Sequence, residues 1–234
     1  MKKPSLNSDV DTSAVANFWI DDYDKNFVYP DKIDYRDFCL PTGNQGDTPH
    51  CVGYTVAGYF EVNYWKKYHI PKQFNSQKIY QFGREYKADT IEGTKLEYSL
   101  ISLLHFLYTG RIYTIVPRSI ENLKYITHQY GCMMLAMKIT DEWYDLTRDG
   151  YIKRHKKPYI IGGHCVLCCG YCKDGIYIQN CWGYEKWGNY GFAVIPWDLA
   201  LSQIDYVVFI DNFNFMDNMI GRFLNESGCR SKCN

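Results

Sequence analysis

The stretch that decides the fold reads Gly43-Asn44-Gln45-Gly46-Asp47-Thr48-Pro49-His50-Cys51. It is a loop dense in turn-forming residues, and a helical pattern of apolar residues follows it to about Tyr68. Cys51 therefore lies where a loop enters a helix, and the positive end of the helix dipole favours a thiolate there. On these residues alone, a cysteine that merely packs at a helix start is the favoured interpretation.

A thiol nucleophile also needs an imidazole, a group that orients the imidazole, and donors for an oxyanion. Gln45 lies in the same loop, and its amide is suited to stand beside the Cys51 backbone N–H as an oxyanion donor. His164 opens an apolar run after two glycines, and Asn180 follows further along the chain. The second half of the chain thus offers both groups that a nucleophilic Cys51 requires.

These segments resemble the papain family of cysteine peptidases. Asn44-Gln45-Gly46 with Cys51 is similar to that family's Asn-Gln-Gly…Cys segment, and Gly163-His164 with the apolar run to Tyr171 is similar to its histidine strand. Asn180-Cys181-Trp182-Gly183…Trp187-Gly188…Gly191-Phe192 is similar to its Asn-Ser-Trp-Gly…Trp-Gly…Gly-Tyr segment, and Asp34-Tyr35-Arg36 and Phe74-Asn75-Ser76-Gln77 are weaker matches. The resemblance runs from about Asp34 to Ile210, in the family's order.

The resemblance implies an α+β, papain-like two-lobed fold, with an N-terminal helical lobe, a C-terminal antiparallel β-barrel-like lobe and the active-site cleft between them. It implies a cysteine peptidase that hydrolyses peptide bonds. Cys51 would attack the scissile carbonyl, and His164, as an imidazolium, would protonate the leaving amine and then serve as the base. Asn180 would orient the ring, and Gln45 would bind the oxyanion with the Cys51 N–H.

The same resemblance implies three residues on the substrate side of the cleft. Gly93 would pair its backbone with an extended peptide, with Thr94 beside it. Trp182 would cover the pair formed by His164 and Asn180 and keep water from it. The implied partner is therefore a peptide or protein substrate, and the implied reaction needs no cofactor.

The sequence departs from the family pattern near the nucleophile. Thr48 stands where secreted members have a disulfide-forming cysteine, which fits a reducing compartment. His50, the neighbour of Cys51 in a turn, is interpreted as a surface residue and not as the base. Val52 replaces the usual aromatic residue. None of these changes removes a catalytic atom.

Periodicity and capping signals predict the secondary structure. Helices are expected over about 52–68, 76–87 and 119–130, and a further helix over 94–107, with Thr94 as N-cap, Glu97 completing a capping box and Gly110 at the C-terminal end. Strands are expected over 133–139, 164–171, 175–179, 190–195 and 206–210. The spacing of apolar residues over 213–224 predicts a last helix, docked on the core or binding a partner.

These elements suggest four parts of the chain. Residues 1–33 form an N-terminal arm, 34–115 a helical lobe with the nucleophile helix, 116–210 a β-rich lobe with His164 and Asn180, and 211–234 a C-terminal extension. The arm either packs on one lobe or lies in the cleft, where it would inhibit the enzyme.

Composition excludes several classes of protein. Lys+Arg and Asp+Glu both number 26 in the 234 residues, so no bulk positive charge favours nucleic acid. No apolar run spans a membrane, and the apolar core of a signal peptide is missing after Lys3. We therefore expect no nucleic-acid or membrane partner and a cytoplasmic location, with a viral or host-delivered origin left open.

The ten cysteines are expected to be reduced, small and apolar in behaviour. Cys165, Cys168, Cys169 and Cys172 have spacings seen in zinc sites. Strand alternation would place Cys165 and Cys169 on one face and Cys168 and Cys172 on the other, so we expect no metal site. The acidic residues at 141, 142 and 145 are interpreted as a solvated turn.

Two alternatives remain open. The same fold and thiol chemistry serve deamidation, transglutamination and removal of ubiquitin-like tags. A chain of this fold can also be an inactive binding module. The sequence does not require this interpretation, because the expected residue types are present at all four catalytic positions, Cys51, His164, Asn180 and Gln45.

Overall fold

The computed structural model describes residues 15–17, 27–86, 93–216, 220, 221 and 223. The helices are α1 (Cys51–Tyr68), α2 (Ser76–Tyr86), α3 (Leu96–Leu103), α4 (Ile120–Tyr130) and α5 (Trp197–Gln203), with short 3-10 turns at Arg36–Phe38 and Asp141–Tyr144. The strands are β1 (Val15–Asn17), β2 (Ile33–Asp34), β3 (Tyr108–Ile115), β4 (Met133–Thr140), β5 (Ile160–Cys172), β6 (Gly175–Gln179), β7 (Phe192–Pro196) and β8 (Ile204–Phe215).

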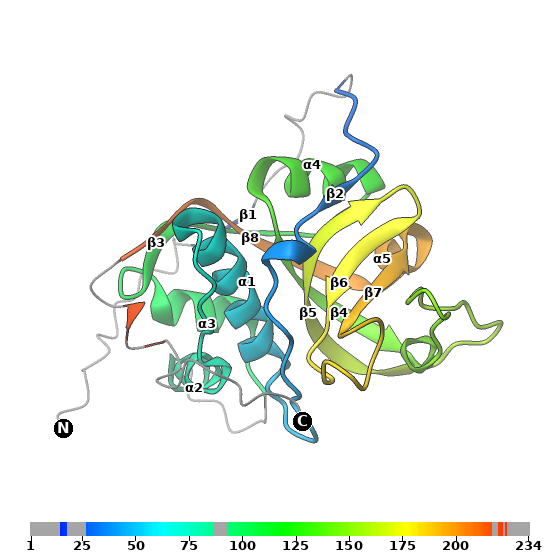
Figure 1. Ribbon diagram of the computed structural model, residues 1–234, viewed down its shortest axis with the longest axis horizontal. Helices are drawn as coiled ribbons and strands as arrows, with labels where there is room; N and C mark the ends of the chain where they lie inside the picture. The colour runs from blue at the N-terminus through cyan, green and yellow to red at the C-terminus, as the bar shows by residue number, and fades with distance from the viewer. Residues whose placement is uncertain (1–14, 18–26, 87–92, 217–219, 222, 224–234) are drawn as a thin grey trace.

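The strands form one sheet in the order β1-β3-β8-β4-β5-β6-β7, and β2 pairs with β5. All pairs are antiparallel except β1 with β3. Helices α1 to α3 gather on one side and strands β4 to β7 on the other (Figure 1). Of the three helices, α1 is the one nearest these strands. The fold is the expected α+β, two-lobed one, and the boundary between the lobes is where α1 meets β5.

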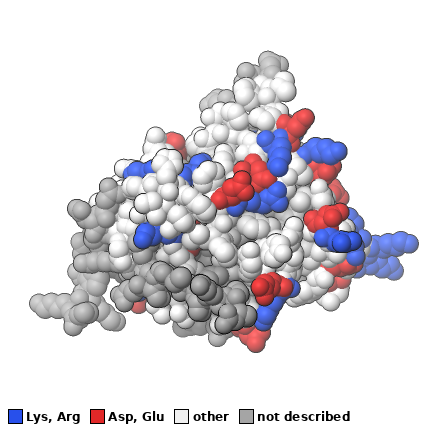
Figure 2. Space-filling view, viewed as in Figure 1, with Lys and Arg blue, Asp and Glu red and all other residues white. Residues whose placement is uncertain are grey.

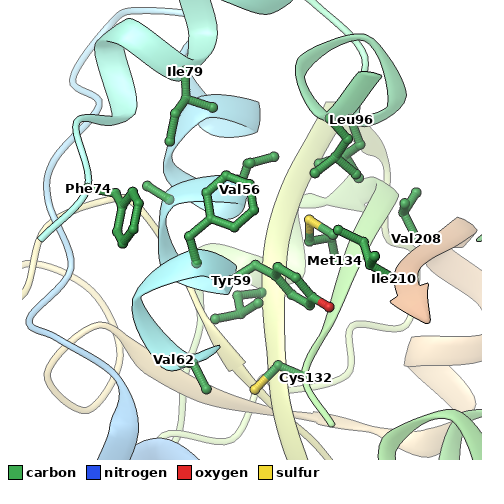
Figure 3. Packing of buried hydrophobic residues seen from close by; sticks show 14 of the residues in the cluster. Val56, Tyr59, Val62, Phe74, Ile79, Leu96, Cys132, Met134, Val208 and Ile210 are labelled. Atoms are coloured by element: carbon green, nitrogen blue, oxygen red, sulfur yellow. The ribbon is translucent and has the colours of Figure 1, made fainter. Parts of the chain in front are cut away.

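Helix α1 is the central element of the core. It is buried over almost every position from Val52 to Val62, as expected of a helix with neighbours on all sides. Figure 3 shows Val56 and Tyr59 of α1 packed toward Met134 of β4, while Ile79 of α2 lies on the other side of the helix. This packing fixes the start of α1, and hence Cys51, against the sheet.

Helices α1 and α2 come into very close contact at Gly53. A Cβ added there would lie 2.3 Å from the Ser76 carbonyl oxygen, so only glycine fits. A second core on the opposite face of the sheet packs α4 and α5 against β4, β5 and β8. The two cores place the sheet in the interior, with Cys51 at one edge of the first core.

The expected helix over 94–107 is wrong at both ends. Helix α3 spans only Leu96–Leu103, and its N-cap is Lys95, which makes no side-chain cap. A short turn follows it, and residues 108–115 then form β3, which the sequence analysis did not predict. Gly110 is not a helix C-terminus: it has φ +145 inside β3, and a Cβ there would lie 2.6 Å from Ile210 Cγ2 of β8.

The predicted last helix is wrong at its start, because residues 213–215 are the end of β8. Ile220, further along the predicted range, is helical. Most of 216–234 lies outside the described residues. Of the N-terminal arm, residues 15–17 and 27–33 are described: 15–17 pair with β3 at the edge of the sheet, and the rings of Phe27 and Tyr29 contact His128 of α4. The prediction that the arm reaches the cleft stays a prediction.

The cysteine run in β5 follows the predicted alternation only in part. Cys165 and Cys169 face the first core and Cys168 the second, as expected. Cys172 faces the first core, because the pairing of β5 with β6 shifts between Cys168 and Gly170 and resets the alternation. Every cysteine in the described part of the chain is a free thiol, and no cluster of His, Cys, Asp or Glu there is arranged to hold a metal ion.

The predicted solvated turn at 141–145 is wrong for Glu142. The segment is a 3-10 turn in which Glu142 and Trp143 are completely buried, while Asp141 and Asp145 stay partly exposed. Figure 2 shows acidic and basic side chains interspersed on the displayed face, without separation by sign. Among the described helices, none has the length and apolar character needed to cross a membrane.

Candidate active site

Cys51 is the first residue of α1 and is half-buried. The N-cap residue, His50, provides no side-chain cap, and the first turn carries no acidic residue. The His50 ring packs instead on Tyr80, with ring centroids 4.2 Å apart. The unsatisfied N–H groups and the positive end of the helix dipole therefore act on Cys51 without competition from its own turn.

Two neighbouring residues of β5 act on the Cys51 sulfur. The hydrogen bond from the Cys165 thiol is the largest influence; burial opposes it, and the hydrogen bond and charge of His164 add to it. Together they lower the pKa of Cys51 to about 4. The Cys165 backbone N–H adds a smaller influence that also lowers the pKa of Cys51. Cys51 is accordingly a thiolate at neutral pH.

The His164 ring is held by Asn180 in one orientation. His164 Nε2 lies 2.8 Å from Asn180 Oδ1, and both residues are buried. The Cys181 backbone N–H also donates to Asn180 Oδ1 at 2.8 Å. A backbone N–H can only donate, so this atom is the amide oxygen and His164 Nε2 must carry a proton. The other ring nitrogen, Nδ1, is left for Cys51.

Aromatic side chains enclose the histidine. The Trp182 ring lies 5.1 Å from the His164 ring between centroids, and Trp143 meets it edge-on at 5.9 Å. Tyr144 stacks on the outer side of Trp182 at 5.5 Å. These rings lower the water content around the pair of His164 and Asn180, which strengthens its hydrogen bond. Trp143 and Tyr144 were missed in the sequence, because their turn carries acidic residues that indicate exposure.

The Gln45 loop is tied to the Asn180 segment. Gln45 N donates to Cys181 O at 2.8 Å, and Asn44 forms a β-bridge with Trp182. The Cys181 thiol donates to Gln45 Oε1 at 2.7 Å, while Gln45 Nε2 donates to Thr48 O at 2.7 Å. An amide nitrogen carries two hydrogens, so the bond to Thr48 uses one of the two. The loop thus places Gln45 beside the same segment that holds His164.

Gly93 and Thr94 are placed differently from the catalytic candidates. Gly93 has φ +105 and its Cβ direction is open, but its N–H donates to Tyr80 Oη at 3.2 Å and its carbonyl accepts from Arg84 Nη1 at 2.8 Å. The Thr94 hydroxyl is buried and lies 3.0 Å from where a Cβ on Gly83 of α2 would be. The substrate contacts predicted for these two residues stay predictions.

The structure thus brings Cys51, His164, Asn180, Gln45 and Trp182 into one site. It adds Cys165, Cys181 and Trp143, which the sequence analysis did not assign to the site. Cys165 directly follows His164 in an alternating strand, so its side chain points to the opposite face, toward α1. That alternation was visible in the sequence, but the helix that Cys165 would meet was not.

Several solved structures that are similar to this chain are cysteine proteases. Xylellain, a cysteine protease from Xylella fastidiosa, matches with a TM-score of 0.68 and 16% identity over 79% of this chain and 87% of that one. The Carica candamarcensis cysteine protease CMS1MS2, solved with E-64, matches with a TM-score of 0.60 and 19% identity over 78% and 98%. Procathepsin L 3 from the Tenebrio molitor larval midgut matches at 0.64 and 13% over 86% and 74%.

The chain therefore has the papain-like cysteine protease fold. At the level of sequence, no protein-family profile matches it and no curated protein is similar to it.

Proposed function

We propose that this chain is a cysteine-type peptidase that hydrolyses peptide bonds with Cys51, His164 and Asn180, and with Gln45 as an oxyanion donor. The observation that carries the proposal is the pairing of His164 with Asn180, whose Oδ1 lies 2.8 Å from His164 Nε2. His164 is also among the groups that lower the pKa of Cys51. A thiol nucleophile needs such an oriented imidazole to attack and then be regenerated.

The proposed reaction runs in two halves. The Cys51 thiolate attacks the scissile carbonyl carbon, and the oxyanion is held by the Cys51 backbone N–H and the second Gln45 Nε2 hydrogen. His164 Nδ1 gives its proton to the amine as the carbon–nitrogen bond breaks, which leaves a thioester on Cys51. His164 then takes a proton from a water that attacks the thioester, and the free acid leaves.

The residues around His164 and a cavity beside Gln45 support the proposed reaction. The Nε2 proton stays on His164 and is donated to Asn180 Oδ1 throughout, so the proton exchanged in each half-reaction is the one on Nδ1. Trp182 and Trp143 exclude water from the far side of the ring. A cavity of about 370 Å³ opens beside Gln45, lined also by His50 and Tyr54, and gives room for the substrate on that side.

The first test is modification and turnover at Cys51. We expect an epoxide-type thiol inhibitor to label Cys51, with a rate that rises through about pH 4 and then stays level, because the thiolate predominates above its pKa. The labelled protein should lose cleavage of dipeptide fluorogenic amides. Mass spectrometry locates the label, and fluorescence reports the cleavage.

The Cys51→Ala variant is the control for both measurements. It should bind no label at this position and cleave no substrate. A wild-type protein that labels at Cys51 but cuts no peptide, and instead changes a glutamine side chain or joins two peptides, would replace hydrolysis with deamidation or transglutamination. A folded protein that does not label at all would indicate an inactive binding module.

A second test isolates the Gln45 donor. We expect Gln45→Glu to lower kcat by about 10²- to 10³-fold, as loss of one oxyanion donor does. Glutamate keeps an acceptor for the Cys181 thiol but has no Nε2 donor. Gln77→Ala, in the same cavity, is the matched control and should keep its kcat. An unchanged kcat in Gln45→Glu would remove Gln45 from the oxyanion site.

A further inference from the structure

A histidine outside the candidate site, His155, lies between two carboxylates at the ends of a single turn. Its Nδ1 atom is 3.0 Å from Asp141 Oδ2, at the start of the 3-10 turn Asp141–Tyr144, and its Nε2 atom is 3.4 Å from Asp145 Oδ2, directly after the turn. These three side chains form what we term the His155 bridge. All three are partly exposed, so the ring can exchange a proton with solvent.

Both ring nitrogens of His155 face an acceptor. A carboxylate can only accept, and a neutral imidazole has one N–H donor and one nitrogen with a lone pair. Only the imidazolium form donates to Asp141 and Asp145 together, so the bridge is complete when His155 is protonated. Once the proton leaves, one ring nitrogen presents its lone pair to a carboxylate, and that side of the bridge opens.

The turn held by this bridge carries two rings of the candidate site. Trp143 meets His164 edge-on at 5.9 Å between ring centroids, and Tyr144 stacks on Trp182 at 5.5 Å. A shift of the turn therefore moves the rings that enclose the histidine of the site.

We propose that His155 is a positioning residue of the candidate site: in its imidazolium form, the His155 bridge keeps the two rings of the Asp141–Tyr144 turn in place beside His164. His155 acts through these rings and not on the reacting atoms. The inference rests on the proposed function only for its effect on peptide cleavage, because the bridge belongs to the folded chain whatever reaction that chain catalyses.

The carboxylates of the bridge favour the protonated ring. The hydrogen bond to Asp141 is the largest influence that raises the pKa of His155; burial opposes it, and the hydrogen bond to Asp145 and the charges of both carboxylates add to it. Asp145 is shared, because the Lys153 ammonium lies 2.6 Å from its other oxygen. Asp141 is accordingly the stronger partner of the ring.

The other charged groups next to His155 have partners of their own. Arg154 lies 3.7 Å from the Glu142 carboxylate and 3.5 Å from that of Asp198. Glu142 accepts from the His155 backbone N–H at 2.9 Å, so its hydrogen bond is to the backbone of His155 and not to the ring. Protonation of the ring therefore depends mainly on the two carboxylates of the bridge.

The direction of the pH effect follows from the raised pKa of His155. A histidine whose pKa is higher in the folded chain than in the unfolded one adds stability below its unfolded pKa, and this contribution is lost as the pH rises through the folded pKa. The bridge is therefore closed at weakly acidic pH and opens as the pH rises through the raised pKa of His155.

The first experiment follows the His155 ring by NMR in the full chain, from about pH 5 to about pH 9. We expect the pKa of His155 to lie above the ordinary range of histidine and to fall in Asp145→Asn, which removes one charge of the bridge and keeps the side-chain volume. An ordinary pKa in wild type that Asp145→Asn leaves unchanged would overturn the proposal.

Two substitutions then separate the charge of His155 from its other properties. His155→Gln has no charge, whereas His155→Arg keeps a charge at every pH and has enough donors for both carboxylates. The readout is the exchange with water of the His164 Nε2 proton, which is held on Asn180 Oδ1, measured by NMR without substrate. Below the pKa of His155, exchange should be about three- to tenfold faster in His155→Gln than in wild type and within about twofold of wild type in His155→Arg. Above that pKa, wild type should approach His155→Gln.

Cleavage of the fluorogenic dipeptide amide gives the kinetic consequence. At weakly acidic pH, kcat should fall about threefold in His155→Gln and return in His155→Arg. The control is His69→Asn, at the exposed left-handed residue after α1, where asparagine is tolerated; it should leave both the exchange rate and kcat as in wild type.

The outcomes separate this inference from the proposed function. Equal exchange rates in wild type and His155→Gln at every pH, or a loss in His155→Arg as large as in His155→Gln, would overturn the role of the bridge. An active enzyme whose kcat does not follow the exchange rate would overturn it as well. A chain that cleaves no peptide but shows the expected exchange rates would support the bridge and overturn the peptidase proposal.

Discussion

We expect the His164→Ala substitution to lower kcat/KM by at least about 10³-fold, because one side chain supplies two effects. The ring is among the groups that lower the pKa of Cys51, and in the proposed reaction it protonates the leaving amine. The hydrogen bond from Cys165, which contributes most to the low pKa of Cys51, remains in this variant. The pKa of Cys51 should therefore rise only part of the way toward its ordinary value.

The measurement has two arms. Cleavage of a fluorogenic dipeptide amide gives kcat/KM, and the pH dependence of epoxide labelling reports Cys51 ionisation. Labelling of the variant should begin at a higher pH than in wild type, since a thiolate forms only above its pKa. The loss of cleavage should exceed the loss of labelling at a pH where Cys51 is ionised in both proteins, because only cleavage needs the proton donor.

His50 provides the matched control. It is adjacent to Cys51 in the chain, but its ring packs on Tyr80. His50→Asn keeps a polar residue at the N-cap and removes the titrating ring, and should change kcat/KM by no more than about threefold. The reverse result, with an inactive His50→Asn and an active His164→Ala, would make His50 the base and discard the proposed site.

The second large effect concerns stability and Glu142. We expect Glu142→Ala to lower the free energy of unfolding by about 3 kcal/mol, because its buried carboxylate satisfies several donors. Thr140 Oγ1 donates to it at 2.7 Å and the His155 backbone N–H at 2.9 Å, and the Arg154 guanidinium lies 3.7 Å away. Alanine would leave the buried groups among these without a partner and open a cavity.

This network reaches the candidate site. Gln203 Nε2 donates to Thr140 Oγ1 at 2.8 Å, and Gln203 Oε1 accepts from Trp143 Nε1 at 2.7 Å. Trp143 is the ring that meets His164 edge-on. The buried Glu142 carboxylate therefore helps to hold Trp143 in place against His164.

Urea unfolding followed by tryptophan fluorescence measures the change. Glu185→Ala, at an exposed turn, is the control and should stay within about 0.5 kcal/mol of wild type. Glu142→Gln should lower the free energy of unfolding by less than Glu142→Ala does, since the amide keeps one acceptor and the volume of the side chain. A Glu142→Ala midpoint equal to that of wild type would show that the network adds nothing to stability.

Local signals in the sequence were sufficient for several elements. Helix α4 begins after Ser119, whose hydroxyl accepts from Asn122 N at 3.2 Å, and strand β6 has the predicted bounds. Both signals lie within a few residues of the element that they define. The start of α1 at Cys51 was also visible, because the loop residues and the apolar spacing meet there.

Elements that depend on distant partners could not be read from the sequence in the same way. Glycine is typical of a helix C-terminus, but at Gly110 the φ of +145 allows β3 to lie close to β8, a strand about a hundred residues later. Glu142 looks like a surface residue until β4 and α5 cover it. At the site, the residue types were predicted, but the contact of Cys165 with Cys51 depends on α1 packing on β5.

The dependence of Cys51 on β5 also bears on how the chain is made. The groups that ionise this sulfur are synthesised about a hundred residues after it, and the strands on either side of them, β4 and β6, must pair before those groups have fixed positions. While the first helices are still emerging from the ribosome, Cys51 is an ordinary thiol. The low pKa of Cys51 can therefore arise only after β5 has been translated and has packed against α1.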